Sequence, residues 1–215
     1  MNWNKYIHPD DLKKISEQIK AVESKSSAEI ITVIANKSST TRHVKLIIFL
    51  LLSVFTLLAF HFFTNLDFNE DKALYIIAIH LVCFIASFLL SQWGFLQRLF
   101  IPRCDRLFQV EAMAEREFYI QRLHMTKEKT GILIYLSLLE KQAVVLADET
   151  INKKLPDGSW QQVINHIVDG IHKKNIYQGI NDGINSCTQK ITELFPSEKN
   201  NSDELPNHVI LRELK

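Results

Sequence analysis

Residues 46–66 have the sequence LIIFLLLSVFTLLAFHFFTNL and contain no Asp, Glu, Lys or Arg. Residues 73–97 form a second uncharged run, ALYIIAIHLVCFIASFLLSQWGFLQ. A bilayer core of roughly 30 Å is crossed by about 20 apolar residues in a helix, whereas helices buried in soluble cores have apolar stretches nearer about 10–14 residues. We therefore expect a transmembrane α-helical hairpin over residues 44–98, with spans at about 46–65 and 73–95.

The average composition conceals this segregation. The 215 residues are 47% hydrophobic and 23% charged, and the formal net charge is +1, as in an ordinary soluble protein. Only four of the charged residues lie within 46–97. Three cysteines exclude a disulfide framework, and the balanced charge predicts no nucleic-acid partner.

Charges on either side of the apolar runs predict the orientation. The flanking basic residues are Lys37, Arg42, Lys45, Arg98, Arg103 and Arg106, and the connecting loop holds Asp67, Glu70, Asp71 and Lys72. Basic residues favour the cytoplasmic side of a membrane. We expect a multi-pass inner (cell) membrane protein with the lipid bilayer as a partner and with both termini and the soluble domain in the cytoplasm.

The polar parts of the chain predict an α/β fold. Helical spacing over 9–23 precedes a β-branched strand at 29–35, before the hairpin. After the hairpin we expect a helix at 103–124, strands at 130–138 and 142–147, and helices at 159–173 and 177–195. Because a single strand is not stable alone, residues 1–43 and 99–196 should form one domain with a small mixed sheet flanked by helices. Residues 197–215 are predicted to be a flexible polar tail.

Acidic residues lie at the strand ends that this topology brings together. If strand 29–35 is parallel to strand 130–138, then Glu29, Thr130 and Asp148 converge at one edge, with Glu149 beside them. Such oxygens can hold a hard divalent cation or serve in phosphoryl transfer. The alternative is that Glu29 and Asp148 only cap their strands and solvate the edge.

Several short segments follow one another in a fixed order: Glu29-Ile30, TGILIYLS at 130–137, Glu140-Lys141-Gln142, Val145-Leu146-Ala147-Asp148, Trp160, Gly179 and Leu194-Phe195-Pro196. Together, over about 9–38 and 103–196, they resemble the TPM domain. The chain is similar to the bacterial membrane-bound branch with two spans after the first strand. The resemblance implies an α/β sandwich, and some members are acid phosphatases or bind calcium through an acidic cluster at a strand edge.

Carried over to this chain, that cluster corresponds to Glu29 and Asp148. Where soluble members often have an acidic pair, this chain has Glu128, Lys129 and Thr130, and a lysine there opposes a cation. We therefore expect a membrane-anchored interaction or accessory module for other membrane proteins. The alternative is a metal-dependent, acid-phosphatase-like enzyme with Glu29 and Asp148 as catalytic residues. It would bind Ca²⁺ or Mg²⁺ through these two carboxylates and Glu149.

Overall fold

The computed structural model describes residues 3–63, 70–156, 158–197, 205 and 209–214. The chain divides into two compact units. We call Met1–Ser38 with Arg106–Lys215 the α/β unit, and Ser39–Asp105 the helical unit. The helical unit is inserted in the sequence after the first strand of the α/β unit.

A four-stranded mixed sheet in the order β3-β2-β1-β4 forms the centre of the α/β unit. Its strands are β1 (Glu29–Ala35), β2 (Gly131–Ser137), β3 (Gln142–Ala147) and β4 (Val209–Arg212). β1 is parallel to β2, and β3 is antiparallel to β2, which confirms the predicted pairing. Every residue of β1 and β2 is buried, as expected for apolar strands covered on both faces.

β4 corrects part of the predicted flexible tail. Val209–Arg212 pair in parallel with β1 from Thr32 to Ala35. Beyond the strand, Asn36 Nδ2 donates to Leu214 O at 3.2 Å, and Leu214 N donates to Asn36 Oδ1 at 2.9 Å. A short apolar strand can add to an edge whose backbone groups need partners, and residues 209–211 have that composition within a polar segment.

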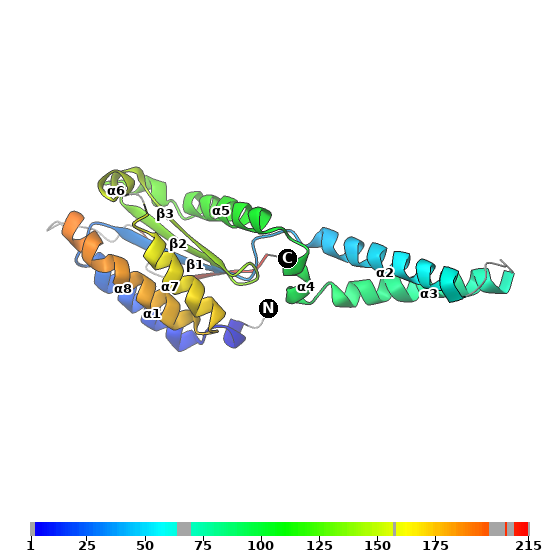
Figure 1. The fold of residues 1–215 in the computed structure, drawn as a ribbon. Coiled ribbons are helices and arrows are strands. Elements are labelled where there is room, and N and C mark those ends of the chain that lie inside the picture. The colour runs from blue at the N-terminus through cyan, green and yellow to red at the C-terminus, as the bar shows by residue number, and fades with distance from the viewer. Residues whose placement is uncertain (1–2, 64–69, 157, 198–204, 206–208, 215) are drawn as a thin grey trace. The chain divides into compact units, whose positions relative to one another are not determined.

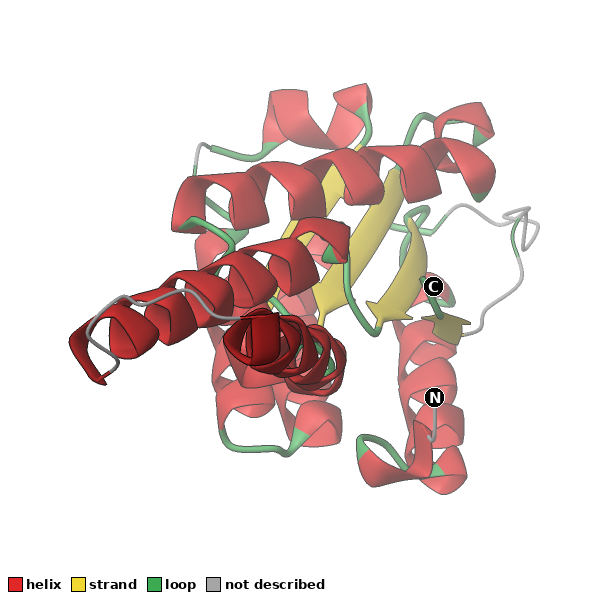
Figure 2. Ribbon diagram, turned by 90° about the vertical axis from the view of Figure 1, so that its right-hand side faces the viewer, coloured by secondary structure: helices red, strands yellow, loops and turns green. Residues whose placement is uncertain are grey.

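Helices cover the two faces of this sheet (Figures 1 and 2). The α/β unit contains α1 (Pro9–Glu23), α5 (Arg103–Ile120, from Arg106 on), α6 (Glu149–Lys154), α7 (Gln161–His172), α8 (Ile176–Leu194) and the 3-10 turns η1 (Trp3–Lys5) and η2 (Leu123–Met125). The side chains of α1, α7 and α8 pack on one face and those of α5 on the other. The short α6 was not predicted. The helix predicted from residue 159 begins at Gln161 instead, with Trp160 as the N-cap of α7.

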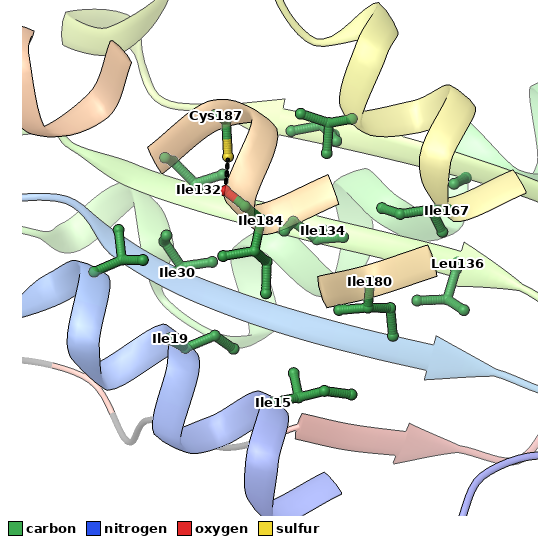
Figure 3. Packing of buried hydrophobic residues seen from close by; sticks show 14 of the residues in the cluster. Ile15, Ile19, Ile30, Ile132, Ile134, Leu136, Ile167, Ile180, Ile184 and Cys187 are labelled. Carbon is green, nitrogen blue, oxygen red and sulfur yellow. Dashed lines mark hydrogen bonds between the residues drawn. The ribbon is translucent and has the colours of Figure 1, made fainter. Parts of the chain in front are cut away.

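Isoleucines dominate the larger core. Figure 3 shows Ile15 and Ile19 of α1 gathered with Ile30 of β1 and Ile184 of α8. Cys187 is buried there, and its Sγ donates to Ile184 O at 3.2 Å. Burial raises the pKa of this thiol to about 12, because a thiolate is poorly solvated in an apolar core.

The helical unit contains α2 (Arg42–Phe63), α3 (Glu70–Leu90) and α4 (Gly94–Leu99). Among the described helices one stretch, His43–Phe62, is long and apolar enough to cross a membrane, and Leu74–Leu90 is a shorter apolar helix. The second apolar run is not one helix to residue 95, because α3 ends at Leu90 and α4 begins at Gly94. The predicted loop residue Asp67 lies outside the described residues.

Candidate functional site

The starts of β1 and β2 and the end of β3 lie at one edge of the sheet. Glu29 is opposite Gly131 in the parallel ladder, and its backbone N donates to Thr130 O at 3.2 Å. Asp148 N donates to Gly131 O at 2.9 Å, which continues the β2–β3 register by one residue. The predicted residues Glu29, Thr130 and Asp148 are therefore neighbours along this edge through their backbones.

Side-chain alternation puts two of the predicted carboxylates in one row. Residues 31, 133 and 144 pack against α5, so Glu29, Gly131 and Asp148 fall on that same face by the two-residue period of a strand. A Cβ on Gly131 would lie only 2.5 Å from Leu123 O. Glycine thus lets η2 approach the sheet between the two carboxylate-bearing strands.

The three predicted carboxylates have different surroundings. Glu29 is buried, with 3% of its surface exposed. Asp148 caps α6, since its Oδ1 accepts from Glu149 N at 2.7 Å, while its Oδ2 is buried and has no hydrogen-bond partner among the described residues. Glu149 is exposed and its Oε1 pairs with Lys153 Nζ at 2.6 Å. This hydrogen bond from Lys153 lowers the pKa of Glu149. The Glu149 carboxylate therefore pairs with Lys153 and does not join Glu29 and Asp148.

This row does not match a resident calcium or magnesium site. Calcium takes about six to eight oxygen ligands, and in the described part of the chain no three His, Cys, Asp or Glu side chains are placed to share a metal ion. Lys129, next to this edge in sequence, donates from Nζ to His124 O at 2.8 Å and adds positive charge near Glu149. We therefore derive no reaction step through a metal, and catalysis by Glu29 and Asp148 stays a prediction.

A buried polar network at the opposite strand ends was not predicted. Tyr135 OH lies 2.9 Å from Ser38 Oγ, which donates to Ser137 Oγ at 2.9 Å. Ser137 Oγ donates to Glu140 Oε2, which also accepts from Ser38 N at 3.1 Å. Burial raises the pKa of Tyr135 to about 12. The network fixes the end of β1 to the β2–β3 turn, and its burial keeps substrates away from its hydroxyls.

A second unpredicted pair ties β4 to α5. Arg212 Nε lies 2.8 Å from Glu117 Oε1, and Arg212 Nη2 donates to Glu117 Oε2 at 3.1 Å. Gln121 Nε2 also donates to Glu117 Oε2 at 3.0 Å. The Glu117 side chain is only 5% exposed, so these donors supply the interactions that water would otherwise give its carboxylate.

The matched family agrees with the resemblance in the sequence. Residues 102–190 match the TPM domain. The matched segment holds β2, β3 and α7, whereas β1 with Glu29 lies outside it. The segment that matches the TPM domain therefore includes Asp148 and Glu149 among the three predicted site residues.

A solved structure shares the fold. The NMR structure of the BA42 protein from the psychrophilic bacterium Bizionia argentinensis superposes with a TM-score of 0.59 at 20% identity, covering 96% of each chain. At this identity the likeness shows the fold alone. No curated protein matches the chain.

Proposed function

We propose that this chain is a membrane-anchored accessory protein whose TPM-type α/β unit works in the cytoplasm on other membrane proteins. The proposal rests first on the surface of α2. Leu46, Leu50 and Phe55 are 63%, 62% and 70% exposed, although each is large and apolar. Soluble proteins rarely expose contiguous apolar surfaces beyond a few hundred Å². A bilayer removes this cost, because lipid tails solvate such side chains.

The shorter helix α3 supports a hairpin anchor. It packs along α2, where the rings of Phe49 and Phe84 meet edge to face at 5.7 Å. Most of its large apolar side chains are exposed, with Leu74 at 71% and Ile77 at 67%. One apolar helix that crosses the bilayer would bring the chain out on the far side, so the second helix must cross back for both termini to share the cytoplasm.

The described surface of the α/β unit favours binding over catalysis. Asp148 and Glu149 already have structural partners at the sheet edge, as described above. Near the end of α5 three large side chains, Tyr119, Ile120 and Met125, are 64%, 48% and 65% exposed. Exposed apolar side chains of this kind are typical of protein contact surfaces.

Site-specific photo-crosslinking in native membranes tests the accessory role. A photoreactive residue in place of Ile120 should give a reproducible adduct with a membrane protein. The same residue in place of Gln162, exposed on α7, is the matched control and should give none. Adducts from neither position, or the same adducts from both, would contradict the proposed surface.

Phosphatase activity is the second candidate, favoured by the buried Asp148 Oδ2 that has no hydrogen-bond partner in the described structure. Turnover of p-nitrophenyl phosphate by the full chain in detergent, with Mg²⁺ or Ca²⁺, tests it. Under the accessory function we expect no turnover above the protein-free blank. Turnover that falls about 100-fold or more in both Glu29→Gln and Asp148→Asn would establish the enzyme instead.

A further inference from the structure

A pocket of about 260 Å³ opens on the α/β unit away from the predicted acidic edge. Its buried part is apolar, formed by Leu138 after β2, Ile171 at the end of α7 and Ile176 at the start of α8. The ring of Tyr6 also lines it and is 38% exposed. The volume lies just below the range of about 300–1,000 Å³ usual for drug-sized ligands, so this pocket suits a small molecule.

The polar lining of the pocket is basic. Lys141, His172 and Lys174 line it, and no acidic side chain does so among the described residues. Within the described structure these three side chains make no hydrogen bond or ion pair with the protein. Two lysines around one cavity repel each other, and an anion bound between them would relieve that repulsion.

Both lysines stand at backbone positions that disfavour them. Lys141 has φ 55° and Lys174 has φ 57°, in the left-handed region where glycine or asparagine is the usual residue. A non-glycine residue there costs of order 1 kcal/mol, and such strained positions cluster at functional sites. Asparagine would satisfy the backbone at both positions, so the backbone does not explain why each carries a positively charged side chain.

The walls of the pocket are held firmly. Gly170 and Gly179 bring α7 and α8 so close that a Cβ on Gly179 would lie 2.8 Å from Gly170 Cα. Asn175 N donates to Gly170 O at 2.9 Å, which closes the loop that bears Lys174. Leu138 N donates to Ala35 O at 3.0 Å and fixes the turn that bears Lys141. Lys141 and Lys174 therefore both lie in short loops that backbone hydrogen bonds hold in place.

We propose that this pocket binds a phosphate monoester carrying a small organic group. A phosphate monoester carries about −1.5 to −2 charges near pH 7, which two lysines match, whereas a carboxylate carries one. Lysine binds phosphate as a point charge. The apolar part of the pocket, with Leu138, Ile171 and Ile176, contacts the carbon skeleton. A soluble metabolite and a phospholipid headgroup share this chemistry.

Titration of the full chain in a neutral detergent with glycerol 3-phosphate tests the site by calorimetry. We expect saturable binding that weakens at least about tenfold in the double variant Lys141→Asn/Lys174→Asn. Asparagine tolerates positive φ, so the variant should fold at least as well as the parent chain. The matched control is Lys129→Asn, another lysine at positive φ (57°) that does not line the pocket. It should change affinity less than about twofold.

Absence of saturable binding, or equal weakening by the control, would overturn the proposal. The source of the phosphate is separated by repeating the titration with the chain in phosphatidylcholine vesicles, with and without phosphatidic acid. Competition by phosphatidic acid assigns the pocket to a lipid headgroup, and undiminished binding assigns it to a soluble ester. The detergent measurement depends only on the α/β unit, so its failure is distinct from failure of the membrane-anchored accessory function.

Discussion

Gly179→Ala should destabilise the α/β unit, because α7 and α8 meet there at a glycine–glycine contact. The added Cβ would lie 2.8 Å from Gly170 Cα and 2.9 Å from His166 O, both backbone atoms that cannot rotate away. Carbon atoms pack at about 3.5–4.0 Å, so the helices must separate by roughly 0.7 Å or more. Overpacking of this kind costs about 1–3 kcal/mol, partly offset by up to about 1 kcal/mol from the helix propensity of alanine. We expect a net loss of about 1–2 kcal/mol.

Urea unfolding of the full chain in detergent measures this loss. The fluorescence of Trp160, which packs against the core beside α7, reports on the unit once Trp3 and Trp93 are replaced by phenylalanine. The control is Gly183→Ala, whose Cβ would have three side-chain atoms as its nearest neighbours, the closest being Ile167 Cγ1 at 3.2 Å. Side chains can adjust, so this variant should be near neutral. A Gly179→Ala chain as stable as the parent would refute the close-packing argument.

Two further predictions concern buried polar groups. Burial raises the folded-state pKa of Tyr135 from 10.0 and of Cys187 from 9.0, each to about 12. The stability that each protonated group gives the folded state is therefore fully present below about pH 9 and is lost as the pH rises toward 12. Tyr135→Phe and Cys187→Ala should each reduce the fall of the urea midpoint between these pH values. An unchanged dependence of the midpoint on pH would contradict this. Arg212→Met should lower the free energy of unfolding by about 2–3 kcal/mol, because it leaves the buried Glu117 carboxylate without its cation. Adding Glu117→Gln to this variant should recover part of the loss. Losses that simply add in the double variant would show that the pair is not coupled.

Local patterns were sufficient to predict the core strands and most helices. β1 and β3 have the predicted bounds, since every residue of Ile30–Ile34 is β-branched and Gln142–Ala147 is bounded by polar residues. β4 was missed because four residues carry too little periodicity, and its stability comes from pairing with β1, about 177 residues earlier. The end of α3 at Leu90 was missed because the uncharged run continues past it to Gln97.

The polar sites depended on contacts that the sequence does not display. The order of strands was enough to bring Glu29 and Asp148 to one edge, but not to reveal that Asp148 caps α6. The network of Ser38, Tyr135 and Ser137 joins residues about a hundred positions apart. The basic pocket combines Lys141 with the end of α7, and neither segment has a recognisable ligand motif.

Membrane topology tests the central claim most directly. Two single-cysteine chains can be labelled with a membrane-impermeant maleimide. One keeps only Cys104, which is exposed and follows the second apolar run, and the other has only a cysteine introduced as Asn69→Cys between the runs. A hairpin anchor with a cytoplasmic α/β unit predicts labelling of the Asn69→Cys chain in spheroplasts, and of Cys104 only after the membrane is permeabilised. Labelling of Cys104 in intact spheroplasts, or release of the chain from membranes by alkaline carbonate, would contradict it.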